Sequence, residues 1–221
     1  TKGYLAEALF NYLTLLGWSP GDDREKLSRD ELVELFSLDR VQQSAARMDF
    51  AKLDNLNGQY LAELPAEDFL QACRQAADNS AFSGSIDDEA YFAKIANLLQ
   101  SRTKKFTDVA DWDYFFVELP EYDENACRKF LKKPGIPEAL AELREALATT
   151  EFAVEKLEKT ILDITEKHGI KPGKLNQPVR VAVTGKTVGA GVYETLDLLG
   201  RERTLKRLDH ALTMARKTVL S

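Results

Sequence analysis

Apolar side chains recur every three or four positions along most of this chain. The first clear stripe contains Leu5, Leu9, Tyr12 and Leu16, and Gly17 ends it. This spacing puts the apolar side chains on one face of an α-helix, so it predicts an amphipathic helix. Comparable patterns predict further helical segments around residues 32–36, 53–64, 69–73, 92–99, 112–116, 140–147, 152–164, 192–199 and 205–212. We therefore predict an all-α protein, a multi-lobed helical bundle.

Capping residues support several of these helix boundaries. Ser28 and Glu31 have the spacing of a capping box, and Asp49 can accept hydrogen bonds from the first N–H groups of the next helix. Pro137 suits the first position of a helix, and Gly200 suits the end of one.

One segment is ambiguous between strand and helix. Residues 178–183, Pro-Val-Arg-Val-Ala-Val, alternate apolar and polar positions and are rich in β-branched side chains, as strands are. No partner strand is visible in the sequence, so we predict a short buried helix here.

Charge is distributed unevenly along the chain. The net charge is −6, yet residues 171–221 contain ten Lys and Arg against four acids, and residues 1–170 hold the compensating −12. A basic end on an acidic protein indicates a preferred place for a polyanion such as a nucleic acid. The alternative is that these charges lie on solvated helix faces.

The sequence offers little catalytic or metal-binding chemistry. Cys73 and Cys127 are far apart, and neither His168 nor His210 has a second ligand or a nucleophile at suitable spacing. We predict no catalytic residue and no metal site in this chain. No apolar run approaches the roughly 20 residues that span a bilayer, so we also expect no membrane association, and the cysteine usage suits the cytoplasm.

The stretch Gly185-Lys186-Thr187 resembles the tail of a phosphate-binding loop. The complete loop requires a glycine five positions before Gly185, where this chain has Arg180. We therefore reject a nucleotide hydrolase. The glycines of residues 185–191 predict a tight turn that either holds a phosphate of a larger ligand or only joins two helices.

Three segments together resemble bacterial glutamyl-tRNA synthetase. They are Gly3 to Leu13 running into Leu16-Gly17-Trp18-Ser19, then residues 36–41, 49–53 and 57–60, and finally residues 178–185 with 199–208. Their order matches that family, and the resemblance covers nearly the whole chain.

The resemblance implies three domains. Residues 1–64 would form a stem-contact domain, residues 65–119 a first anticodon-binding lobe and residues 120–221 a second, with Pro120 at the joint. The family's catalytic Rossmann domain would precede Thr1, and its ATP-binding motifs are not in this chain. We therefore expect the chain to be inactive alone, as part of a monomeric enzyme that joins glutamate to tRNA(Glu) using ATP and Mg²⁺.

The same resemblance assigns four RNA contacts. Lys52 matches a basic position at the inner corner of the tRNA, and Arg102 an arginine at the third anticodon base that separates glutamate from glutamine tRNAs. Arg180 matches an arginine at the anticodon, and Val192 an apolar residue against an anticodon base. A guanidinium can pair with a base edge through two hydrogen bonds, whereas phosphate contacts carry no sequence information. Phosphate contacts are expected from the remaining basic residues of these segments, Lys104, Lys105, Lys186, Arg201 and Arg203.

Structural alternatives remain for these residues. Arg102 could pair with Asp108 or a carbonyl at a helix end, Arg180 could form a buried salt bridge, and Lys52 could be an ordinary surface lysine. The competing function is a helical module that binds another protein without RNA specificity. RNA binding would weaken steeply with salt, and an apolar protein interface would not.

Overall fold

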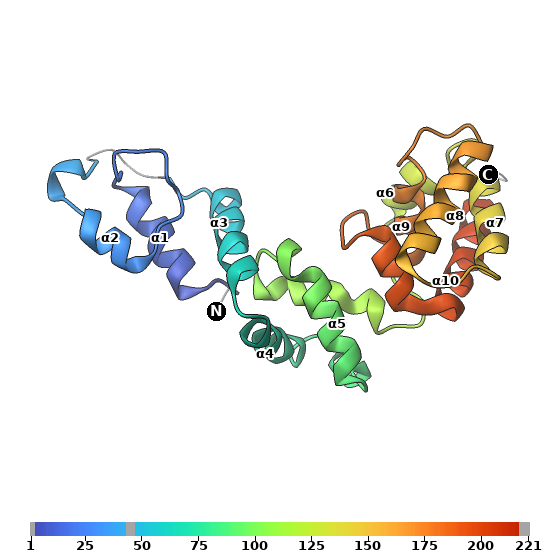
Figure 1. The fold of residues 1–221 in the computed structure, drawn as a ribbon, viewed down its shortest axis with the longest axis horizontal. Helices are drawn as coiled ribbons and strands as arrows, with labels where there is room; N and C mark the ends of the chain where they lie inside the picture. Colours follow the sequence, from blue (N-terminus) through green and yellow to red (C-terminus); the bar gives the residue numbers. More distant parts are fainter. Residues whose placement is uncertain (1–2, 43–46, 217–221) are drawn as a thin grey trace. The chain divides into compact units, whose positions relative to one another are not determined.

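The computed structural model of the protein describes residues 3–42 and 47–216 (Figure 1). Their secondary structure is helical, apart from one isolated bridge between Trp18 and Val41, which confirms the all-α prediction. The chain divides into two compact units, Thr1–Asp111 (unit 1) and Trp112–Ser221 (unit 2). The division into three domains inferred from the sequence stays a prediction.

Unit 1 is built from short helices connected by turns. In chain order they are α1 (Ala6–Leu16), α2 (Arg29–Leu35), η1 (Leu38–Arg40), α3 (Phe50–Glu63), α4 (Ala66–Ala77), η2 (Ser83–Ser85), α5 (Glu89–Leu99) and η3 (Gln100–Arg102), followed by η4 (Phe106–Phe115), which runs into unit 2.

The apolar stripe of the first helix packs as the sequence predicts. Tyr12 of α1 lies against Leu53 and Leu56 of α3, with Leu9 and Leu16 at the edge of this cluster. A second cluster, formed by Trp18, Leu27 and Leu32 together with Leu15 and Leu35, fixes α2 beside α1. The N-terminal half of unit 1 therefore has two small cores.

Capping fixes where these helices begin. Ser28 and Glu31 form the predicted capping box, with the N–H of Glu31 donating to Ser28 Oγ and the N–H of Ser28 donating to Glu31. Asp49 accepts hydrogen bonds from the N–H groups of Ala51 and Lys52 at the start of α3, as predicted.

A buried amide joins three segments of unit 1. Asn57 of α3 is 0% exposed. Its Oδ1 accepts a hydrogen bond from the N–H of Leu5 at 2.8 Å, and its Nδ2 donates to the carbonyl of Lys104. This side chain therefore fixes the chain before α1 and the loop after η3 to α3.

Unit 2 is a bundle centred on its last helix. Its elements are α6 (Glu124–Ala126), the π-helical turn η5 (Cys127–Leu131), α7 (Ile136–Leu147), α8 (Val154–Lys167), α9 (Asn176–Thr184) and α10 (Val192–Arg216). Helix α10 packs against α7, α8 and α9 (Figure 1). Gly200 has non-helical angles (φ 74°, ψ 170°) and breaks α10 where the sequence predicts a helix end.

The strand-like segment 178–183 is helical, as predicted, because it lies within α9. Val179, Val181, Ala182 and Val183 are all 0% exposed, and Arg180 alone is half-buried. Burial on nearly every side explains the continuous apolar pattern without any sheet.

Candidate nucleic-acid interface

Arg102 is exposed at the last position of η3. The turn that carries it is fastened on both sides. Gln100 Nε2 donates to the carbonyls of Leu61 and Leu64 at 3.0 and 2.8 Å, and the N–H and Oγ1 of Thr103 donate to the Leu99 carbonyl. Because the backbone of this turn is already anchored, binding of a base edge would order only the Arg102 side chain and not the turn.

Lys104 and Lys105 follow Arg102 and contact α3. Lys104 Nζ lies 2.6 Å from Asn55 Oδ1, and Lys105 Nζ lies 3.0 Å from Asp54 Oδ2. Tyr4 also donates a hydrogen bond to Asp54. Burial raises the pKa of Asp54, but the hydrogen bonds from Tyr4 and Lys105 outweigh it and hold the pKa below its ordinary value. Lys105 Nζ therefore has an acidic partner, whereas the partner of Lys104 Nζ is the neutral amide of Asn55.

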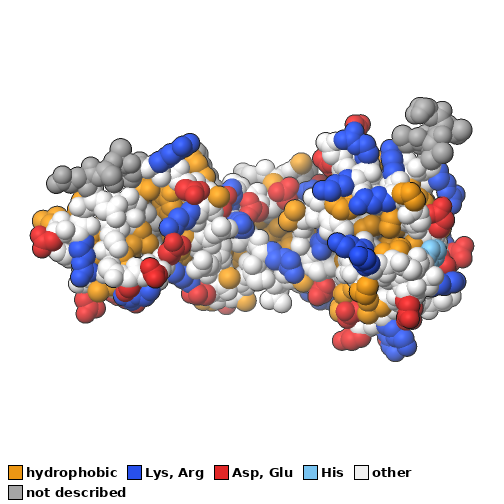
Figure 2. All heavy atoms as spheres, turned by 90° about the horizontal axis from the view of Figure 1, so that it is seen from above, with side chains coloured by type: hydrophobic (Ala, Val, Ile, Leu, Met, Phe, Trp, Pro, Cys, Tyr) orange, Lys and Arg blue, Asp and Glu red, His pale blue; other side chains and the backbone are white. Residues whose placement is uncertain are grey.

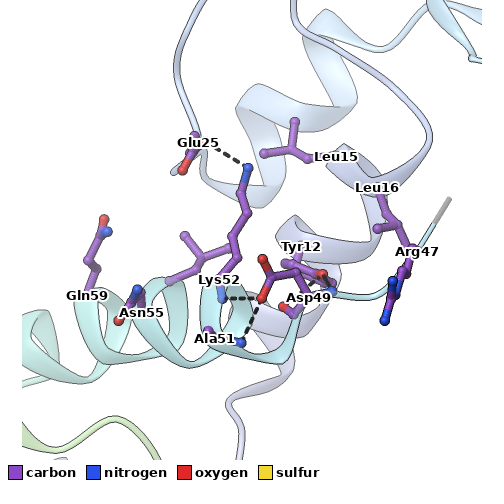
Figure 3. Close-up of a pocket in the computed structure, with 11 residues that line it drawn as sticks. Tyr12, Leu15, Leu16, Glu25, Arg47, Asp49, Ala51, Lys52, Asn55 and Gln59 are labelled. Carbon is purple, nitrogen blue, oxygen red and sulfur yellow. Dashed lines mark hydrogen bonds and ion pairs between the residues drawn. The ribbon is translucent and has the colours of Figure 1, made fainter.

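Lys52 lines a pocket of about 440 Å³ between α1, α3 and the loop that contains Glu25 (Figure 3). Its Nζ makes an ion pair with Glu25 Oε1 at 2.8 Å. The pocket also has Arg47 and Asp49 on its wall. Charges of both signs line it, so it is not a cationic cleft.

Arg180 is half-buried on α9 and donates from Nη1 to the carbonyl of Ala190. Its guanidinium thus ties α9 to the turn before α10. Val192, at the start of α10, is 4% exposed. In this conformation Val192 presents almost no surface on which a base could stack, and its assignment stays a prediction.

The glycine-rich turn ends α9 and is packed tightly. Gly185 has φ 73°, a left-handed conformation that favours glycine, and a Cβ there would overlap the carbonyl of Glu121. The N–H of Lys186 donates to Thr184 Oγ1 at 3.1 Å, and its ammonium pairs with Asp113 Oδ1 at 2.8 Å. The turn therefore serves packing within unit 2, and its lysine is balanced by an acid.

The basic residues of α10 are largely occupied by acceptors within unit 2. Arg203 Nη1 donates to the carbonyl of Phe115 at 2.7 Å, and Lys206 pairs with Glu118. The hydrogen bond from Lys206 lowers the pKa of Glu118. Arg201 donates to the carbonyl of Thr150 at 2.7 Å. The net charge of +6 in the sequence therefore overstates the charge available to a ligand.

Arg207 is completely buried, and the sequence reasoning missed its role. It is 0% exposed, and its guanidinium donates to the carbonyls of Glu118, Val183, Tyr114 and Val117, at 3.2, 2.6, 2.7 and 2.6 Å. The sequence contained one signal, because position 207 belongs to the same helical face as the buried residues Thr204, Leu208 and Ala211.

Basic side chains are nevertheless grouped on the surface of unit 2. Figure 2 shows several Lys and Arg side chains close together on one face of this unit, with acidic side chains interspersed. Within residues 3–42 and 47–216, no group of three His, Cys, Asp or Glu side chains could hold a metal ion. No helix in the same ranges is long and apolar enough to cross a membrane.

The predicted contact residues are divided between the two units. Lys52, Arg102, Lys104 and Lys105 belong to unit 1, and the others to unit 2, namely Arg180, Lys186, Val192, Arg201 and Arg203. Neither Arg102 nor Arg180 is sealed in a core. An exposed arginine on an anchored turn, beside lysines that can meet phosphates, is the chemistry expected of a surface that binds an RNA loop.

Comparison with known proteins identifies the class. The family model of the anticodon binding domain matches residues 62–212, which is more than half of the chain. The chain therefore belongs to the family of anticodon-binding domains.

Similar full-length proteins include several glutamate–tRNA ligases. The enzyme of Desulforudis audaxviator is 38% identical over 217 residues, covering 95% of this chain and 43% of the relative, and that of Moorella thermoacetica is 38% identical over 230 residues, covering 99% and 46%. The structure also resembles a glutamate tRNA ligase from Elizabethkingia meningosepticum, with a TM-score of 0.74 and 29% identity over 97% of this chain and 42% of that one. The family resemblance seen in the sequence is thus confirmed, and the chain spans less than half the length of these relatives.

Proposed function

We propose that this chain is the part of a cytoplasmic, monomeric glutamate–tRNA ligase that binds tRNA(Glu) and reads its anticodon. The observation that carries the proposal is the exposed guanidinium of Arg102 on its anchored turn, inside the region that matches the anticodon-binding family. The similarity to glutamate–tRNA ligases supports the choice of tRNA.

Each basic residue has a distinct part in this proposal. Arg102 pairs with the edge of the third anticodon base, and Arg180 of α9, already bonded to Ala190 in the turn before α10, contacts the anticodon. Lys104, whose ammonium is bonded to a neutral amide, contacts a phosphate. Weaker backbone contacts come from the cations that are already bonded to a carboxylate or a backbone carbonyl, namely Lys52, Lys105, Lys186, Arg201 and Arg203. Val192, at the start of α10, is assigned the apolar contact with an anticodon base, which requires a change in its surroundings because it is 4% exposed.

The proposal assigns the chemistry of ligation to the longer protein. Glutamate, ATP and Mg²⁺ would be used by the part of such a ligase that does not align with this chain, which covers 43% of its relative from Desulforudis audaxviator. The described residues of this chain bind and orient RNA.

The test compares two RNAs that differ only in the third anticodon base. Dissociation constants of the chain are measured for tRNA(Glu) and for this variant. Replacing Arg102 with Gln removes the bidentate donor, so we expect discrimination between the RNAs to fall by about 1–3 kcal/mol, or roughly 5- to 150-fold.

The matched control is Arg29→Gln, which removes the same charge from another exposed arginine of unit 1. This variant should keep the discrimination of the unmodified chain. If Arg102→Gln discriminates as well as the control, Arg102 does not read the base.

A further inference from the structure

A basic segment of unit 2 lies outside the stretch 171–221 and is not used by the proposal above. Residues 125–137 contain Arg128, Lys129, Lys132 and Lys133 and no acidic residue. Arg128, Lys129 and Lys133 are exposed, and Lys132 is half-buried. We call these four residues with Phe130 the 128–133 cluster.

Buried side chains anchor the turn that carries the 128–133 cluster. It begins in η5, where Cys127 is 3% and Leu131 0% exposed, so both side chains anchor the turn in the core. Asp123 caps the preceding α6 by accepting from the N–H of Ala126. The charged side chains are therefore presented outward from a fixed backbone.

Its accessible cations differ from those of α10 in their partners. Among the described residues, Arg128, Lys129 and Lys133 form no ion pair; Arg128 donates to Asn125 Oδ1 at 2.7 Å, and both lysines lie over the Phe130 ring, 5.2 and 5.9 Å from its centre. The α10 cations Arg203, Lys206 and Arg207 are instead held by carbonyls and by a carboxylate. The cluster therefore keeps its charge for a ligand.

The arrangement favours phosphates over bases. The Phe130 ring is half-buried and two ammonium groups lie over it, so they compete with a base for the exposed part of the ring. Several exposed cationic donors around one ring fit a ligand with closely spaced negative oxygens. A phosphodiester backbone has that chemistry, and its binding relieves the repulsion among the like charges.

The cluster also lies beside the helix that carries Arg180. Turn η5 packs against α9, and the N–H of Asp123, just before α6, donates to the carbonyl of Gly185 at the end of α9. An RNA strand that contacts Arg180 would therefore pass close to these cations, because both belong to adjacent elements of unit 2.

We propose that the 128–133 cluster binds the phosphate backbone of the tRNA and is a main source of the salt-dependent affinity of unit 2. This inference rests on the proposed function and extends it to residues that the sequence did not indicate. The cluster adds affinity for any RNA of suitable shape, independently of the anticodon.

The experiment measures how tRNA(Glu) affinity of the full chain depends on salt. The test variant is Arg128→Gln/Lys129→Gln/Lys133→Gln. Lys132 is left intact because it is half-buried and has a partner of its own. The matched control, Lys156→Gln/Lys159→Gln/Arg216→Gln, removes the same charge from exposed positions of α8 and α10. Circular dichroism verifies that both variants fold.

We expect the test variant to lower the slope of log affinity against log salt by about 0.7–0.9 for each phosphate that the protein no longer neutralises, and the control to leave it nearly unchanged. The decrease in affinity should be equal for tRNA(Glu) and for the RNA with an altered third anticodon base.

Two outcomes overturn the inference in different ways. If the unmodified chain binds tRNA(Glu) and the two triple variants have the same slope, this inference alone fails. If the unmodified chain does not bind tRNA at all, the proposed function fails with it. A loss confined to one anticodon would instead indicate base reading and would also contradict the phosphate assignment.

Discussion

Two basic regions of the molecule use their charge in different ways. In unit 1, Arg102 and Lys104 lie exposed on a turn that neutral hydrogen bonds hold in place. In unit 2, Lys186, Lys206 and Arg207 extend toward the segment 113–118 and are held there by its carboxylates and carbonyls. The first region presents charge to the outside, and the second uses charge to attach one segment to the bundle.

This difference shows that the position of a charge in the sequence does not establish its purpose. Segment 113–118 contains the end of the 3-10 helix η4, and Arg203 and Arg207 donate to backbone carbonyls there. Cations at the end of a helix are also favoured by its dipole. Much of the basic C-terminal sequence is therefore accounted for by folding.

The largest effect is expected when Arg207 is replaced with Met, which has a similar length and no hydrogen-bond donor. Four buried carbonyls would lose their partner, so we expect the free energy of unfolding to fall by about 3–5 kcal/mol. Urea unfolding followed by circular dichroism measures the change. Arg201→Met, which removes one exposed hydrogen bond, serves as the control and should cost about 1 kcal/mol or less. A loss for Arg207→Met as small as for the control would refute the structural role.

The next effect concerns the turn that Lys186 occupies. Gly185→Ala would place a Cβ on the carbonyl of Glu121 and strain a left-handed residue, so we expect a loss of about 2–4 kcal/mol. Gly135 has a similar φ of 79° but open space around it, so Gly135→Ala should cost only the conformational term of about 1–2 kcal/mol. If thermal unfolding shows the same loss of stability for both variants, the backbone near Gly185 relaxes to accommodate the Cβ, and the close contact with Glu121 does not stabilise the turn.

A smaller effect is expected at the ion pair of Lys105 and Asp54 in unit 1. Asp54→Asn removes the negative charge beside Lys105 and replaces one of the two acceptor oxygens with a donor, so it should cost about 1 kcal/mol at pH 7. Because the folded-state pKa of Asp54 is lowered, its contribution is present above its unfolded pKa of about 3.9 and is lost as pH falls through the folded value. The difference between variant and parent should therefore shrink below about pH 4 in urea unfolding. A difference that persists unchanged at lower pH would contradict this assignment.

The smallest change in stability is expected at Arg102. The side chain is exposed and its turn is fastened by Gln100 and Thr103, so Arg102→Gln should alter the free energy of unfolding by less than about 0.5 kcal/mol. A larger decrease in the free energy of unfolding, measured with urea, would show that Arg102 stabilises the fold, as Arg207 does in unit 2.

Local features of the fold could be predicted where sequence alone determines them. The capping box at Ser28 and Glu31, the cap at Asp49 and the break at Gly200 each depend on one or two neighbouring residues. The pattern of residues 178–183 alone fits a strand. The helix could be predicted there only because the sequence shows no second strand with which it could pair.

Features that depend on distant partners could not be predicted. Whether Arg207 lies inside or outside is decided by carbonyls of Tyr114 and Val117, which precede it by about ninety residues. The π-helical turn at Cys127–Leu131 depends on packing of Cys127 and Leu131 in the core, so the cations beside it look like ordinary surface charge in the sequence. The exposure of Arg102 therefore agrees with the role predicted for it, whereas much of the site predicted in unit 2 is occupied by partners within the protein.

The amide that joins three segments of unit 1 has a consequence for chemical ageing. Asn57 precedes Gly58, and an asparagine before glycine loses its amide readily when the backbone is mobile. In the folded chain both residues are held within α3 and the Asn57 side chain is 0% exposed, so deamidation is suppressed. In an unfolded chain it can proceed, and the resulting carboxylate would face the carbonyl of Lys104 instead of donating to it. Conversion of Asn57 to an acid in the unfolded chain would therefore remove one of the hydrogen bonds that join these segments and hinder the refolding of unit 1.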